Sequence, residues 1–153
     1  MRRRTAITAA ALLALTASGC NLEDRIIRED VVLPPPPPDE ALQIVGLPVP
    51  DAELTGEEGL HPSELSEEWS LRITFTMEPW EVDAWIVEAF GGPEWLLERE
   101  KGDPVDQRIP PEDVLDGSRS KKGTNPEDRS ATYAVLVHPD GRDVIIAAAW
   151  TAR

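Results

Sequence analysis

The sequence contains few of the residues that carry chemistry in small enzymes and metalloproteins. Its 153 residues include a single cysteine, Cys20, so no disulfide can form within the chain. The two histidines, His61 and His138, stand in unrelated settings, and neither belongs to a short metal-binding motif. A nucleophile-elbow motif, a phosphate-binding glycine loop and a zinc-binding helix motif are also missing. These absences predict a protein that is not an enzyme and holds no metal or cofactor.

Basic residues are also scarce. The chain has 15 lysines and arginines against 29 aspartates and glutamates, which gives a net charge of −14. Nucleic acids and anionic membrane surfaces attract the opposite charge, so the composition argues against both as electrostatic partners. Cationic partners, such as metal ions and basic proteins or peptides, are the ones it favours. The simpler interpretation, which we prefer at this stage, is that the acidic surface keeps the protein soluble.

The apolar run at residues 6–17 follows three arginines at residues 2–4 and ends in small residues. It contains about a dozen residues, whereas a membrane-spanning helix needs roughly 20. A basic region, an apolar region and small residues in this order are typical of a secretory signal peptide. Residues 1–19 carry no acidic residue, so their removal leaves 12 basic and 29 acidic residues and a net charge of −17.

Residues 15–20, Leu-Thr-Ala-Ser-Gly-Cys, resemble the lipobox of bacterial lipoproteins. The resemblance covers residues 1–20 only, and Ala17 stands where the family usually has leucine. It implies cleavage after Gly19, a diacylglycerol thioether on Cys20, and further acylation by fatty acids such as palmitate. The protein would then be anchored to a bacterial cell membrane and face away from the cytoplasm. The alternative is an ordinary signal peptide, because Ala17 and Gly19 also suit the general signal peptidase and would leave a free thiol.

Residues 20–39 are predicted to form the lipidated cysteine and a proline-rich tether. Five consecutive prolines at residues 34–38 favour a polyproline II rod of roughly 15 Å. Residues 40–153 are long enough for one folded domain with a single core. Within it, residues 41–50 are apolar enough to dock, with one helical turn that ends near Gly46.

Residues 69–77 alternate apolar and polar side chains, which predicts a strand with one buried face. A helix is predicted for residues 79–90, with Pro79 at its start and a glycine pair after its end. Its buried stripe comprises Val82, Trp85, Ile86, Ala89 and Phe90. Residues 131–138 and 143–152 flank a turn and are apolar on both faces, which indicates a central β-hairpin.

The order strand, helix, strand, strand predicts an α+β fold, a small antiparallel sheet with one main helix packed on a face. An additional strand is expected at residues 52–55, and a short helix at residues 93–100 that buries Trp95 and either Leu96 or Leu97. Residues 102–130 are expected to form a long loop, which is either mobile, the interpretation we favour, or a functional site. We expect residues 41–50 to cover the second face of the hairpin.

Three apolar residues of the predicted helix, Trp80, Ala84 and Val87, lie outside its main buried stripe. They either pack under the loop at residues 102–130, which we favour, or form an exposed surface that binds a partner. Asp83 is expected at the rim of the buried stripe, where its charge is solvated. The leading functional hypothesis is a membrane-anchored envelope lipoprotein whose domain binds a protein or a small ligand. The alternative is an accessory or inhibitory subunit of an envelope enzyme or secretion system.

Overall fold

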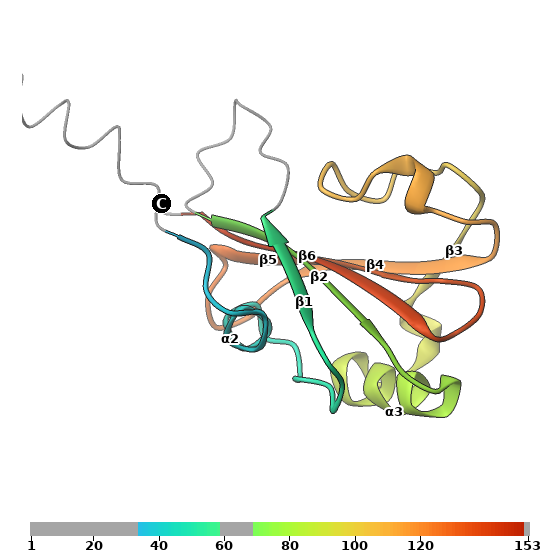
Figure 1. Cartoon of the computed structure of the whole chain (residues 1–153), viewed down its shortest axis with the longest axis horizontal. Helices are drawn as coiled ribbons and strands as arrows, with labels where there is room; N and C mark the ends of the chain where they lie inside the picture. The colour runs from blue at the N-terminus through green and yellow to red at the C-terminus, as the bar shows by residue number, and fades with distance from the viewer. Residues whose placement is uncertain (1–33, 59–68, 152–153) are drawn as a thin grey trace, which may run out of the picture. The chain divides into compact units, whose positions relative to one another are not determined.

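The computed structural model describes residues 34–58 and 69–151. Its fold is α+β, as the sequence predicts: a six-stranded antiparallel sheet with two helices (Figure 1). The strand order across the sheet is β1-β2-β6-β5-β4-β3. The strands are β1 (Thr55–Glu58), β2 (Trp69–Thr76), β3 (Leu97–Arg99), β4 (Ser118–Thr124), β5 (Ala131–Val137) and β6 (Asp143–Trp150). The helices are α2 (Pro38–Ile44) and α3 (Pro79–Phe90).

The predicted hairpin lies at the centre of this sheet. Strands β5 and β6 pair in register, with Val135 opposite Ile146, and β6 also pairs with β2. In the connecting turn, the Gly141 amide donates to the His138 carbonyl at 3.0 Å, and Gly141 has a φ of 71°, a conformation that favours glycine. Residues 144–149 of β6 are all buried, which confirms that both faces of the hairpin are covered.

The first face of the sheet is covered by both helices (Figure 1). The odd-numbered residues of β2 alternate inward, and Ile73 lies opposite Ile146 in the same layer. Helix α2 adds Ala41 and Leu42 to this core, and Val45 follows directly after the helix. Helix α3 adds the predicted residues Val82, Trp85 and Ile86. Ala89 and Phe90 are half-buried at its edge. We call this layer the first face.

The second face is covered by residues 103–115, and not by residues 41–50 as expected. Val105, Ile109 and Val114 from this segment pack against the inward side chains of β5 and β6, which are Ala134, Leu136, Ile145 and Ala147. Residues 41–50 lie on the first face instead, because their apolar side chains continue the hydrophobic layer around α3. The expected mobile loop at 102–130 is therefore wrong: part of it covers the sheet, and another part forms β4.

Strand β4 escaped prediction because its sequence, Ser-Arg-Ser-Lys-Lys-Gly-Thr, has almost no apolar residues. It is stabilised by pairing with β5 on one side and β3 on the other. The short helix expected at residues 93–100 is also wrong. Residues Pro93–Trp95 form a single 3-10 turn, and Leu97–Arg99 form the edge strand β3. Of the side chains expected to be buried there, Leu96 is buried, whereas Trp95 and Leu97 are exposed.

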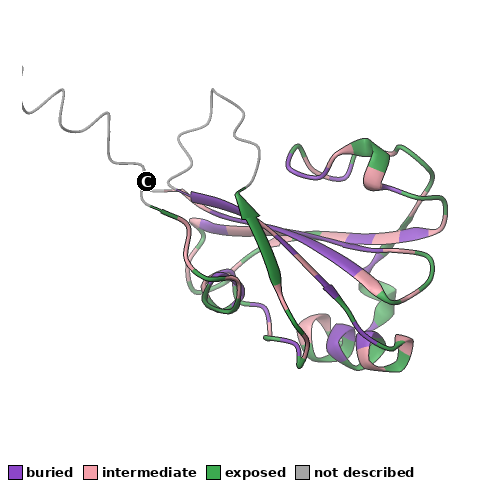
Figure 2. Ribbon diagram, viewed as in Figure 1, coloured by how far each residue is buried: buried purple, intermediate pink, exposed green. Residues whose placement is uncertain are grey.

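The additional N-terminal strand exists but lies later in the sequence than expected. Strand β1 begins at Thr55, the last residue of the predicted range, and pairs with β2 at the edge of the sheet. All of its residues are exposed (Figure 2). The proline run leads directly into α2, whose first residue is Pro38. Proline is well suited to that position, because the first turn of a helix needs no amide donor.

Candidate partner-binding surface on helix α3

Helix α3 is defined at both ends by its sequence. Pro79 occupies the first turn, and the Glu78 amide donates to the Glu81 carboxylate at 3.1 Å. At the other end Gly91 has a φ of 89°, and its amide donates to the Val87 carbonyl at 2.8 Å. The left-handed conformation ends the helix at a residue that adopts it without strain. These boundaries agree with the predicted helix at residues 79–90.

The three residues outside the buried stripe are exposed. Trp80 has 70% of its surface accessible and Val87 has 53%, and Ala84 between them is also exposed. The favoured expectation that they pack under the loop at 102–130 is therefore wrong, because the covering part of that range, residues 103–115, lies on the second face and α3 lies on the first. We call Trp80, Ala84 and Val87 the α3 stripe. The structure agrees with the other interpretation in one respect: these residues form an apolar surface that is exposed to solvent.

The apolar surface extends past the end of the helix to Trp95. This tryptophan is 59% exposed. Its indole ring lies beside Gly91, because a side chain at position 91 would place its Cβ 3.9 Å from the indole nitrogen. Residues three or four apart lie on the same side of a helix, so position 91 continues the line of Trp80, Ala84 and Val87. Sequence reasoning assigned Trp95 to the core, since nothing in a single tryptophan distinguishes an exposed position from a buried one.

A groove of about 290 Å³ runs beside the α3 stripe. One wall is residues 49–51, and the other is α3; we call it the α3 groove. Its wall is held in place by Trp85, whose indole N–H donates to the Pro48 carbonyl at 2.9 Å. The lining residues are Val49, Pro50, Asp51, Met77, Trp80, Glu81, Ala84, Trp85 and Glu88. Trp80 and Ala84 thus belong to both features, so the groove and the stripe form one continuous surface.

Asp83 is solvated, as predicted. Its side chain is 67% exposed, and its closest cationic partner is Arg119 of β4, with 3.9 Å between Oδ1 and Nη2. At that distance and exposure the pair contributes little to stability. A buried carboxylate is therefore not present at this position.

A second groove, of about 510 Å³, lies near His138 on the second face. Three of its polar side chains, Thr76, Asp143 and His138, form hydrogen bonds. The Thr76 hydroxyl donates to Asp143 Oδ1 at 2.7 Å, and His138 Nε2 lies 3.0 Å from the Asp113 carbonyl oxygen. The imidazole thus links the hairpin turn to the covering segment.

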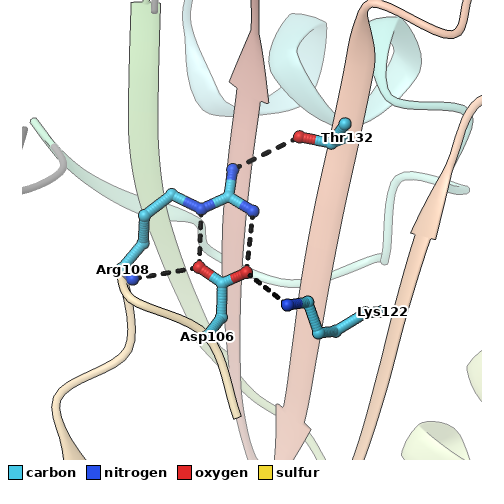
Figure 3. Close-up of polar contacts among 4 residues, drawn as sticks. All are labelled: Asp106, Arg108, Lys122 and Thr132. Atoms are coloured by element: carbon cyan, nitrogen blue, oxygen red, sulfur yellow. Dashed lines mark hydrogen bonds and ion pairs between the residues drawn. The ribbon is translucent and has the colours of Figure 1, made fainter. Parts of the chain in front are cut away.

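A charged cluster holds the covering segment against the sheet (Figure 3). The side chains of Asp106 and Arg108 are 7% and 9% exposed, and Nε of Arg108 lies 2.7 Å from Oδ1 of Asp106. Lys122 of β4 contributes a further contact at 3.4 Å, and Thr132 of β5 accepts from Arg108 at 3.5 Å. Burial would raise the pKa of Asp106, but hydrogen bonds from Arg108 and the charges of Arg108 and Lys122 outweigh it and lower the pKa. We interpret the cluster as structural, because its charges satisfy one another.

Among residues 34–58 and 69–151, no group of three or more His, Cys, Asp or Glu side chains is arranged to hold a metal ion. In the same part of the chain, no helix has the length and apolarity needed to cross a membrane. Cys20 and His61 lie outside the described residues. Comparisons with protein-family models, with curated proteins and with solved structures give no significant match to this chain.

Proposed function

We propose that the protein is a membrane-anchored envelope lipoprotein whose folded domain binds another protein through the α3 stripe. The observation that carries the binding role is the exposure of Trp80, at 70%, beside Ala84 and Val87. Contiguous exposed apolar side chains of this kind are costly in water and commonly mark interaction surfaces. Tryptophan is also among the residues that contribute most to binding at protein interfaces.

The anchor part of the proposal rests on the lipobox-like sequence that ends at Cys20. Each buried methylene of an acyl chain contributes about 0.8 kcal/mol, so two or three chains would hold the protein on a membrane. Tethered in this way, the domain would meet its partner at the membrane surface. Its role is that of a binding protein, with no chemical step assigned to it.

The anchor is tested by the intact mass of the protein extracted from membranes of its native host. The expected mass lacks residues 1–19 and includes acyl chains. A Cys20→Ala variant should be released from the membrane or remain unprocessed. Wild-type protein found unmodified and soluble would contradict the anchor and would leave Cys20 as a free thiol.

The binding role is tested by site-specific photocrosslinking in intact cells. A photoreactive amino acid replaces Ala84, and the matched control carries it at Asp116, which is also exposed but directly follows the segment that covers the second face. A discrete adduct from position 84 and none from position 116 is the expected result. Equal adducts from both positions, or none from position 84, would contradict a binding surface on α3.

A further inference from the structure

The two sides of the α3 stripe carry different charges. An α-helix turns by about 100° per residue, which places Glu81 and Glu88 on the same side of the stripe. Both line the α3 groove, and Asp51 adds a third carboxylate from the opposite wall. Among the described residues that line this groove there is no lysine, arginine or histidine. The groove side of the stripe is therefore apolar at its centre and negative at its edges.

The other side of the stripe has its own cations. Arg119 lies 3.9 Å from Asp83, and the ammonium of Lys121 lies 5.6 Å from the Phe90 ring centre and 5.8 Å from that of Trp95. Both basic residues come from β4, next to the helix. On this side, basic side chains therefore lie near exposed acidic residues such as Asp83, whereas no basic side chain lines the α3 groove.

The negative charge of the α3 groove and of the whole chain distinguishes between three possible partners for this surface. A second copy of the chain carries the same negative net charge, −14 for the whole sequence and −17 without residues 1–19, so electrostatic repulsion opposes its approach. An anionic lipid surface is opposed for the same reason. A cationic segment with an apolar face matches both properties, since its apolar side chains would cover Trp80 while its basic side chains meet Glu81 and Glu88.

We infer that the α3 stripe and groove bind an amphipathic helix of a partner protein whose polar face is rich in lysine or arginine. The inference rests on the proposed binding role of α3 and adds the chemistry of the partner. Helices that bind grooves present apolar residues at i, i+3, i+4 and i+7, the spacing that would match the row of Trp80, Ala84 and Val87. The basic residues would lie toward the wall formed by residues 49–51.

The test measures binding of three synthetic peptides to the full chain by fluorescence polarisation. The first is an amphipathic helix of about 18 residues of leucine, alanine and lysine, about 27 Å long and able to span the stripe. The second replaces every lysine with glutamate, and the third keeps the lysines but replaces the leucines with serine. If the chain is acylated, it is measured in phosphatidylcholine nanodiscs, and empty nanodiscs serve as the blank. If the chain is found to be unacylated, it is measured in solution.

Two variants locate the binding. Trp80→Ser should weaken the lysine-leucine peptide about 30-fold, the effect of losing a dominant interface residue. The combined change Asp51→Asn, Glu81→Gln and Glu88→Gln should weaken it about 10-fold at low salt, with a smaller difference at high salt. The matched control neutralises three exposed acids elsewhere, Glu112→Gln, Asp116→Asn and Glu127→Gln, and should leave the affinity within about twofold.

The inference is supported only if the lysine-leucine peptide binds more tightly than both other peptides and both groove variants weaken it. Comparable binding of the glutamate peptide, or equal losses in the groove and control triple variants, would overturn it. Self-association of the chain through Trp80, or binding of the stripe to anionic vesicles, would also overturn it. If an adduct forms from position 84 in cells but the lysine-leucine peptide has no advantage, the binding role stands and the inference about the partner falls. If neither the crosslinking nor the peptide binding gives the expected result, both the binding role and the inference about the partner are contradicted.

Discussion

The two faces of the sheet are covered by different kinds of structure. Helices α2 and α3 cover the first face, and an irregular segment at residues 103–115 covers the second. The helical cover is held by regular apolar packing, whereas the irregular cover adds the buried ion pair of Asp106 and Arg108. A helix also has an outer side, and here that side carries the α3 stripe. The first face therefore carries the surface for which we propose a binding role, and the cover of the second face adds a buried ion pair to the apolar packing.

The largest expected effect comes from removing an apolar contact of the irregular cover. Ile109 is 2% exposed in the second-face core, and Ile109→Ala should lower the free energy of unfolding by about 2–5 kcal/mol, as in other cores. Chemical denaturation measures the change. Leu115→Ala is the control, since Leu115 is 40% exposed and should cost far less. A loss below about 0.5 kcal/mol for Ile109→Ala, the range of surface substitutions, would mean that the segment does not stabilise the sheet.

The next effect tests the ion pair that distinguishes the second face. Asp106→Asn removes the charge that Arg108 faces in a poorly solvated site and should lower the free energy of unfolding by about 1–3 kcal/mol. Lys122→Gln is the control, because Lys122 is 58% exposed and its contact with Asp106 is longer. Its effect should stay below about 1 kcal/mol. Equal effects of the two variants would show that burial of the Asp106 and Arg108 pair adds nothing.

The same variant predicts a pH dependence with a definite sign. Despite burial, which acts to raise it, the pKa of Asp106 is held below its ordinary value of 3.8 by Arg108 and Lys122. A carboxyl group whose pKa is lower in the folded state than in the unfolded state stabilises the folded state. This stabilisation is complete at pH values above the pKa of the unfolded state, and it is lost as the pH falls through the pKa of the folded state. The difference in unfolding free energy between wild type and Asp106→Asn should therefore be constant above about pH 5 and shrink below pH 3.8. A difference that grows on acidification would contradict this assignment.

A smaller effect is expected on the first face at the wall of the α3 groove. Trp85→Phe removes the hydrogen bond to the Pro48 carbonyl and should cost about 1–2 kcal/mol, since the aromatic ring still fills most of the site. The amide hydrogens of Val49 and Asp51 should then exchange faster, because the hydrogen bond that ties this segment to α3 is lost. Unchanged exchange in this segment would mean that other contacts hold the groove wall.

The smallest effect on stability is expected for the α3 stripe itself. Trp80→Ser should change the free energy of unfolding by less than about 0.5 kcal/mol, because the side chain is 70% exposed and few protein contacts are lost. Thermal denaturation is a sufficient measurement. A loss comparable to that of Ile109→Ala would make Trp80 a core residue and would remove the reason for assigning it a binding role.

The same difference between the faces explains what the sequence could predict. The central hairpin, strand β2 and helix α3 carry regular apolar periodicity, and their positions were predicted nearly residue for residue. The second-face cover has no period, because Val105, Ile109 and Val114 are spaced irregularly among polar residues. Strand β4 is polar and owes its conformation to its neighbours. Such elements depend on tertiary contacts that a single sequence does not display.

The candidate site was predictable in part. The spacing of Trp80, Ala84 and Val87 marks them as one row on the helix, but whether that row is covered depends on where residues 102–130 run. From the sequence we expected residues 102–130 to cover this row, but the part of that range that packs on the sheet lies on the second face. The α3 groove was not predictable, since it requires residues 49–51 to approach the helix through the Trp85 hydrogen bond.

The most direct test of the account is the yield of the position-84 crosslink in a chain that also carries Trp80→Ser. If the α3 stripe binds the partner, the adduct should fall at least about fivefold in intact cells, because tryptophan at an interface commonly dominates the binding energy. Protein abundance is compared in the same samples. An undiminished yield at equal abundance would show that whatever lies near position 84 does not depend on the apolar stripe, and would contradict the central claim.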